Sequence, residues 1–123
     1  MTHPNDILLY VRNPEASGKF YANLLGCEPV ESSETFAMFA LRTGMMLGLW
    51  RHDEVLPSPM FPGGGNEIGW RVKDDEELDK LHADWTSRGV PVAMKPTMLD
   101  FGRSFVVVDP DGHRLRVYAL AEH

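Results

Sequence analysis

The sequence predicts an α+β fold in which two βαβββ modules pair into a cleft-forming sheet. The same succession of patterns, a strand, a helix and three further strands, occurs twice along the chain. The two copies flank a segment rich in proline and glycine, which neither a helix nor a central strand accommodates. Matching residues recur at a nearly constant spacing, such as Pro29 and Pro91, 62 positions apart. We therefore expect a single domain over residues 1–123, with module 1 at about 5–56, a linker at 57–65 and module 2 at about 66–120.

The first module opens with an apolar strand at residues 7–11. Asn13 suits the N-cap of the following helix and Pro14 its first position, because a capping oxygen and a preset φ both favour helix initiation. Gly26 is expected to end that helix, since glycine adopts a positive φ without strain. Three more strands are predicted after it, at residues 29–32, 35–41 and 45–50.

The second module repeats this order. A strand at residues 67–73 precedes a helix that starts at the acidic Asp74 and is closed by Gly89. A short strand is expected at residues 92–94. Because residues 96–102 begin with a proline and end with a glycine, they are predicted to form a loop that acts as a lip.

A β-hairpin is predicted to complete the second module. Residues 105–108 are aromatic or β-branched and suit a buried strand, and the Asp-Pro-Asp-Gly sequence at 109–112 suits a turn. On the return strand, Arg114, Arg116 and Tyr118 alternate with Leu115 and Val117, so they share one face. Taken alone, such a face is equally typical of a solvated sheet surface. Its role depends on the rest of the chain.

Composition excludes several classes of partner. A chain of 123 residues with 43% hydrophobic residues is an ordinary globular domain. Its formal net charge of −6 argues against nucleic acid or an anionic membrane as the partner. No apolar run reaches the length of a membrane span, and the first residues lack signal-peptide character. With one cysteine and therefore no internal disulfide, we expect a cytoplasmic protein.

The order and spacing of several short motifs resemble the vicinal oxygen chelate superfamily, which includes glyoxalase I, extradiol dioxygenases and bleomycin-binding proteins. The resemblance implies the paired-module fold and, for enzymes of the superfamily, a divalent metal held by four strands. The motifs that carry it are Val-Arg-Asn at 11–13, Leu-Leu-Gly at 24–26, Glu-Ile-Gly-Trp-Arg-Val-Lys-Asp at 67–74 and Asp-Pro-Asp-Gly-His at 109–113.

The metal-ligand positions that the resemblance implies are poorly filled. They fall on Asp6, on residues 48–50, on Glu67 and on Arg116. An arginine stays protonated and has no lone pair for a metal, and residues 48–50 offer no ligand. Two carboxylates without imidazole make a poor transition-metal site. We therefore predict no metal and no other cofactor, and expect Arg116 to pair with an acidic residue or with a ligand carboxylate.

Within the superfamily, the sequence is most similar to the branch of phenazine-antibiotic resistance proteins. This second resemblance implies metal-free binding of a planar aromatic small molecule and an intertwined homodimer whose pockets draw on both subunits. It is carried by residues 47–50, 67–69, 81–86 and 100–105. The ligand-binding residues predicted on this basis and from the strand patterns are Phe36, Gly48, Trp50, Glu67, Asp100, Phe101, Arg103, Arg116 and Tyr118.

Among the tryptophans, Trp50 is the candidate for stacking on a ligand. It ends a strand and precedes a charged segment, and Gly48 on the same face leaves room for a flat molecule. A sheet-edge or dimer contact is an equally good explanation for it. Trp70 falls on a strand position that faces the helix, Trp85 falls on the apolar stripe of that helix, and both are expected in the core. The prediction is metal-independent sequestration of a planar aromatic molecule, with no catalytic residue.

Two alternatives stay open from the sequence. One is a metal-dependent glyoxalase- or dioxygenase-type enzyme that uses Asp6, Glu67 and a displaced ligand such as His52. The other is a dimer whose cleft is filled by its own side chains.

Overall fold

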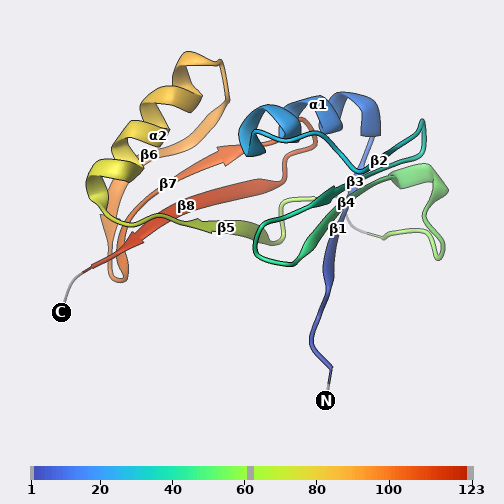
Figure 1. Ribbon diagram of the computed structural model, residues 1–123, viewed down its shortest axis with the longest axis horizontal. Coiled ribbons are helices and arrows are strands. Elements are labelled where there is room, and N and C mark those ends of the chain that lie inside the picture. The colour runs from blue at the N-terminus through green and yellow to red at the C-terminus, as the bar shows by residue number, and fades with distance from the viewer. Residues whose placement is uncertain (1, 61–62, 122–123) are drawn as a thin grey trace. The chain divides into compact units, whose positions relative to one another are not determined.

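The structure of the protein is a computed structural model that describes residues 2–60 and 63–121. It consists of two compact units, Met1–Gly63 and Gly64–His123, which we call module 1 and module 2 and describe one at a time. Each module holds one four-stranded sheet with one helix lying along it (Figure 1). The predicted α+β fold and the βαβββ order of each module are confirmed. The predicted cleft between the modules stays a prediction.

Both modules have the same topology. In module 1 the sheet order is β1-β4-β3-β2, with β1 and β4 parallel, and in module 2 it is β5-β8-β7-β6, with β5 and β8 parallel. The remaining neighbours are antiparallel. Module 1 contains β1 (Asp6–Val11), α1 (Pro14–Leu25), β2 (Glu31–Ser32), β3 (Phe36–Ala40), β4 (Met46–Arg51) and the short 3₁₀ helix η1 (His52–Glu54). Module 2 contains β5 (Glu67–Arg71), α2 (Asp75–Ser87), β6 (Val92–Leu99), β7 (Gly102–Val108) and β8 (Arg114–Leu120).

The predicted helix starts are confirmed by their capping hydrogen bonds. The Asn13 side chain accepts bonds from the backbone N–H groups of the second and third residues after it, both at 3.1 Å. At α2 the Asp74 carboxylate accepts from the Glu77 N–H at 2.9 Å, and the Glu77 carboxylate accepts from the Lys73 N–H at 3.0 Å. This reciprocal pair is a capping box. Gly26 ends α1 with a φ of 70°, as predicted.

The hairpin of module 2 also forms as predicted. The Asp109 side chain accepts from the N–H groups of Asp111 and His113 at 2.9 and 2.8 Å, and Gly112 adopts a φ of 85°. At the start of β7, Gly102 has a φ of 142°, and a Cβ there would collide with the Ala119 carbonyl on the neighbouring strand. A glycine is therefore required where these two strands begin to pair.

One prediction about module 2 is wrong. Residues 96–102 were expected to form a loop, but β6 continues through Pro96 to Leu99, and only Asp100 and Phe101 form the turn to β7. The proline is tolerated because β6 is an edge strand, and its pairing with β7 shifts register between Met94 and Thr97. A strand with a tight turn replaces the expected lip.

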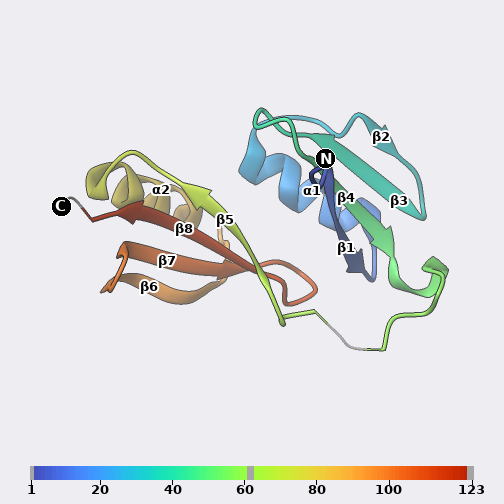
Figure 2. The ribbon, with the colours of Figure 1, turned by 90° about the horizontal axis from the view of Figure 1, so that it is seen from below.

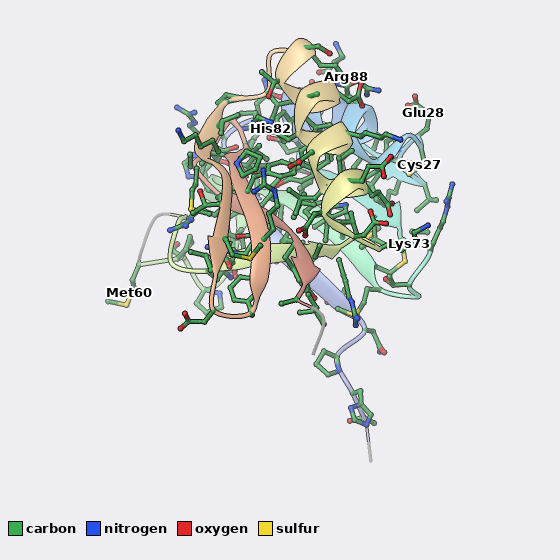
Figure 3. All side chains as sticks on the ribbon, turned by 90° about the vertical axis from the view of Figure 1, so that its left-hand side faces the viewer. Cys27, Glu28, Met60, Lys73, His82 and Arg88 are labelled. Atoms are coloured by element: carbon green, nitrogen blue, oxygen red, sulfur yellow. The ribbon has the colours of Figure 1, made fainter. Side chains whose placement is uncertain are left out.

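The core of each module lies between its helix and the facing side of its sheet (Figure 2). In module 2, Trp85 of α2 is 2% exposed and contacts Trp70 of β5 and Phe105 of β7 edge to face, with ring centroids 6.0 and 5.6 Å apart. His82 also projects from α2 toward the strands and meets Phe105 at 5.2 Å (Figure 3). Trp70 therefore lies on the helix-facing side of the sheet, as the strand pattern predicted, and packs there against Trp85 of α2.

Candidate functional site

The side of the module 1 sheet that faces away from α1 is apolar. Because side chains alternate along a strand, the residues between the buried helix-facing ones all point to this second side. Leu8 and Tyr10 are 40% and 41% exposed, and the central residues of β3 and β4 on this side are half-buried or buried. Asp6, Glu31 and Ala40, at the margins of this side, are exposed. We call this surface the apolar face and define it by Leu8, Tyr10, Phe36, Met38, Met46, Gly48 and Trp50.

Three aromatic side chains form a row across the apolar face. Trp50 of β4 is paired with Tyr10 of β1 on one side and with Phe36 of β3 on the other. The rings of Tyr10 and Trp50 meet edge to face, with centroids 6.5 Å apart and an interplanar angle of 76°. In such an arrangement the edge of one ring packs against the face of the other.

The space beside Gly48 is filled by its neighbours. A Cβ at Gly48 would lie 2.5 Å from Leu8 Cδ2 and 3.2 Å from Phe36 Cζ. These two side chains therefore lean over the glycine from the strands on either side. The room that the sequence suggested there for a flat molecule is occupied in this structure by the ends of Leu8 and Phe36.

The charged segment after Trp50 is paired internally. The Arg51 guanidinium bonds Asp53 at 2.6 Å and Glu54 at 3.0 Å, which folds η1 back onto the end of β4. The hydrogen bond from Arg51 lowers the pKa of the Asp53 carboxyl. These contacts hold the end of the strand on which Trp50 lies.

The corresponding side of the module 2 sheet is polar. Arg116 of β8 donates two hydrogen bonds to Glu67 of β5, from Nε to Oε1 at 2.6 Å and from a terminal nitrogen to Oε2 at 3.3 Å. Its other terminal nitrogen donates to Ser104 Oγ at 3.0 Å. The hydrogen bonds from Arg116, together with the charges of Arg116 and Arg114, lower the pKa of the Glu67 carboxyl. Glu67 therefore stays ionised, and both groups have a partner.

Tyr118 stands next to this pair on β8 and covers Gly69 of β5. Its Cε1 is 3.3 Å from the position of a Cβ on Gly69, so the ring rests against the strand. Phe101, from the β6–β7 turn, meets the Tyr118 ring edge to face at 6.1 Å. Four predicted site residues, Glu67, Arg116, Tyr118 and Phe101, therefore lie on or beside one surface. We call it the polar face and define it by Glu67, Gly69, Arg71, Ser104, Arg114, Arg116 and Tyr118.

Two other predicted site residues lie elsewhere in module 2. Arg103 is on the helix-facing side of β7, where its Nε bonds Asp79 of α2 at 2.9 Å. Asp100 is exposed in the turn before β7. The position of Arg103 follows from strand alternation, since the buried Phe105 and Val107 are on the same side. The structure does not bring Arg103 together with Arg116.

The residues at the implied metal positions do not fit a metal. Arg116, where the family pattern has a glutamate, donates two N–H bonds to Glu67 and offers no lone pair. Leu47 and Leu49 point toward α1 and are buried. Across residues 2–60 and 63–121, no three His, Cys, Asp or Glu side chains gather in a way that could hold an ion. We derive no metal-dependent step from this set.

A groove of about 470 Å³ on module 1 contains none of the predicted site residues. It lies between α1 and β2, with Lys19, Asn23 and Glu28 among its lining residues. It is on the opposite side of the sheet from the aromatic row, because α1 covers the side that carries Ala37 and Phe39.

The two βαβββ modules, each with an antiparallel meander and one parallel pair, define the class of protein. The sequence model of the Glyoxalase/Bleomycin resistance protein/Dioxygenase superfamily matches residues 3–117. The chain belongs to this superfamily, and the resemblance seen in its motifs is confirmed.

Particular relatives are consistent with this assignment. The phenazine antibiotic resistance protein EhpR of Enterobacter agglomerans is 35% identical over 122 residues, which cover 95% of this chain and 92% of the relative. The solution NMR structure of a protein from Agrobacterium tumefaciens is 49% identical, with a TM-score of 0.86 over 99% of this chain and all of the other. A glyoxalase-related enzyme from Fulvimarina pelagi, 21% identical with a TM-score of 0.84 over 97% of this chain and 88% of its own, shares the fold.

Sequence reasoning did not single out Leu8 and Tyr10 of the apolar face. Both lie on a strand that was recognised, but the direction of its alternate side chains was not considered. The parallel pairing of β1 with β4 sets Tyr10 beside Trp50, and alternation along β1 is the signal that could have found both residues. On β5, alternation did place Arg71 on the same side as Glu67, and the pairing with β8 sets it beside Tyr118.

Proposed function

We propose that this protein binds and sequesters a planar aromatic small molecule without a metal, as part of a resistance-type role. The observation that carries the proposal is the row of Tyr10, Trp50 and Phe36 on the apolar face. A similar chain is named a phenazine antibiotic resistance protein, and phenazines are planar and aromatic. Stacking on exposed rings is the interaction that suits such a molecule.

Simple energetics give the expected affinity. A drug-sized ligand gains about 0.3 kcal/mol per heavy atom, or about 6 kcal/mol for roughly twenty atoms. Stacking on two rings would supply about 1–3 kcal/mol of this total. A binding free energy of about 6 kcal/mol corresponds to a dissociation constant in the range of tens of micromolar. That affinity suits a protein that holds its ligand stoichiometrically and releases it unchanged.

The polar face supports binding more than chemistry. Arg116 and Glu67 are engaged with each other, and the lowered pKa of Glu67 makes it a weak base at neutral pH. The side chains that we propose to contact the ligand are the aromatic residues of the two faces, with the polar groups beside them. They are Phe36 and Trp50 in module 1, and Glu67, Asp100, Phe101, Arg116 and Tyr118 in module 2, whereas Gly48 is covered by Leu8 and Phe36.

The proposal includes a cytoplasmic homodimer. Exposed apolar side chains such as Leu8 and Tyr10 suit a surface that a second copy covers. The free thiol of Cys27 is exposed, which suits a reducing compartment. None of the helices is long and apolar enough to cross a membrane in the part of the chain that the structure describes. Light scattering after size-exclusion chromatography tests the dimer.

Calorimetric titration with phenazine-1-carboxylic acid tests the binding function. We expect a micromolar dissociation constant for the wild type and a loss of about tenfold or more for Trp50→Ala, because a large stacking surface is removed. Trp50→Phe keeps a ring and should bind within about threefold of the wild type. Trp70→Phe, on the helix-facing side of the other module, is the matched control and should leave the affinity unchanged. Equal affinities for wild type and Trp50→Ala, or no binding at all, would contradict the proposal.

A further inference from the structure

The charges on the polar face do not balance. Strands β5 and β8 place three arginines there, Arg71, Arg114 and Arg116, and one carboxylate, Glu67. Two positive charges are therefore unmatched on one surface of a chain whose formal net charge is −6. Such a local reversal of sign attracts an anion.

The three arginines differ in what they are free to bind. Arg116 is the least exposed, at 17% for its side chain, and its nitrogens already bond Glu67 and Ser104. Arg114 is directed at the same carboxylate, with its Nε 3.8 Å from Glu67 Oε2. Arg71 is exposed, and the described residues provide it with no ion pair or side-chain hydrogen bond. Arg71 is therefore the arginine of this face to which the described residues offer no ionic partner.

Arg71 is adjacent to an aromatic ring with a polar end. It is paired with Tyr118 across the parallel strands, and the ladder continues one residue further, where the Val72 N–H donates to the Tyr118 carbonyl at 2.9 Å. The Tyr118 ring is held by its contacts with Gly69 and Phe101. Within the described residues, its hydroxyl makes no hydrogen bond to protein. Arg71 and Tyr118 thus place a guanidinium and a phenol on adjacent strands of one face, beside an apolar ring surface.

We propose that Arg71 and the Tyr118 hydroxyl form a subsite that binds the carboxylate of an aryl carboxylic acid, with the rings of Tyr118 and Phe101 contacting the aromatic part of that ligand. A guanidinium presents its N–H groups in a fork that matches the two oxygens of a carboxylate, and a phenol adds a third donor. The subsite rests on the proposed function, because it names the substituent that selects one planar aromatic molecule over another.

A pair of isosteric probes isolates the charge. Phenazine-1-carboxylate and phenazine-1-carboxamide have the same ring system and nearly the same shape, but only the first is an anion at pH 7.5. We expect the wild type to prefer the carboxylate by about tenfold at low salt. Raising the salt concentration should reduce that preference, because an exposed ion pair is screened.

Variants of the intact protein assign the preference to Arg71. Arg71→Gln should reduce the preference for the carboxylate to about twofold or less and leave the affinity for the carboxamide within about twofold. Tyr118→Phe keeps the ring and should lower carboxylate affinity by about two- to threefold. Arg42→Gln makes the same charge change in the exposed β3–β4 turn of module 1 and should keep the full preference. Melting curves show that each variant is folded.

The outcomes separate this subsite from the binding function. If both probes bind with micromolar affinity but Arg71→Gln retains the same preference as Arg42→Gln, the subsite is wrong and sequestration stands. If both probes bind and the wild type shows no preference for the carboxylate, the subsite is likewise wrong and sequestration stands. If neither probe binds the wild type, the proposed function fails and the subsite fails with it.

Discussion

The two modules share a topology, but the sheet faces that point away from their helices, the apolar face and the polar face, differ in chemistry. On the parallel pairs β1–β4 and β5–β8, three successive positions correspond between the modules. The pair Asp6 and Met46 in module 1 corresponds to Glu67 and Arg114 in module 2. The next pair, Leu8 and Gly48, corresponds to Gly69 and Arg116. The third pair, Tyr10 and Trp50, corresponds to Arg71 and Tyr118. After the acidic residue that both modules carry, Asp6 or Glu67, module 1 thus presents apolar and aromatic side chains where module 2 presents three arginines and a phenol.

This difference shows which surfaces of the repeated fold must be apolar and which can carry other side chains. The helix-facing sides must be apolar in both modules, because each buries one helix against one sheet. The apolar face and the polar face have no such requirement, and their residue types differ at nearly every corresponding position. One glycine is present in each set, covered by Leu8 and Phe36 in module 1 and by Tyr118 in module 2. The residues that bind a ligand are therefore expected on the apolar face and the polar face.

The largest expected effect tests whether the cores of the two modules are equally important for stability. Phe39 of module 1 is fully buried and Trp85 of module 2 is 2% exposed. Truncating either to alanine removes a large apolar side chain and leaves a cavity, so each should lower the free energy of unfolding by about 3–5 kcal/mol. Urea denaturation followed by circular dichroism measures this. A cost below about 1 kcal/mol for one of the two would show that the two cores are not built alike.

The second effect contrasts the corresponding acidic residues, Asp6 and Glu67. Glu67→Ala leaves the Arg116 guanidinium, 17% exposed, without its carboxylate and should cost about 1–2 kcal/mol of unfolding free energy. Asp6→Ala removes an exposed carboxylate for which the described residues provide no ion pair, and should change stability by less than about 0.5 kcal/mol. The same denaturation experiment compares them. Equal costs would mean that the Arg116–Glu67 pair contributes nothing.

Much of the fold could be predicted from the sequence because its signals are local. The Asn13 and Asp74 caps, the Asp-Pro-Asp-Gly turn and the alternation of Arg116 with buried neighbours each depend on a few consecutive residues. The strand β6 was missed because Pro96 is compatible with a strand only at a sheet edge, and the strand order is not a local property.

The candidate site was harder to predict because it depends on which strands are neighbours. Strand alternation placed Glu67 and Arg116 on one face, but their hydrogen bonds require the parallel pairing of β5 with β8. The same kind of pairing brings Leu8 over Gly48, which no local pattern reveals. The Asp79–Arg103 pair likewise joins a helix to a strand 24 residues further along the chain.

A smaller effect is expected when the pH is lowered. The pKa of Glu67 is below its ordinary value of 4.5 in the folded protein, so ionised Glu67 stabilises the fold. That contribution is complete above pH 4.5 and is lost as the pH falls through the lowered pKa. The difference in unfolding free energy between wild type and Glu67→Gln should be up to about 1 kcal/mol at pH 7, because the pair is partly exposed.

Urea denaturation of wild type and Glu67→Gln at a series of pH values from 7 to 3 measures this difference. We expect it to stay constant down to about pH 5 and to shrink below pH 4.5. A difference that stays constant to pH 3 would show that the carboxylate charge is not what stabilises the pair.

The smallest effect separates the two arginines that approach Glu67. Arg114→Met introduces the residue found at the corresponding position of module 1, Met46. Because Arg114 is 44% exposed and its Nε is 3.8 Å from the carboxylate, the change in unfolding free energy should be below about 0.5 kcal/mol. A double-mutant cycle between Arg114→Met and Glu67→Gln should give a coupling near zero, whereas the cycle between Arg116→Met and Glu67→Gln should give about 1 kcal/mol. If the Arg114 cycle gave the larger coupling, Arg116 would be the arginine left free for a ligand. Arg116 would then not be the guanidinium engaged by Glu67, and Arg71 would not be distinguished from it.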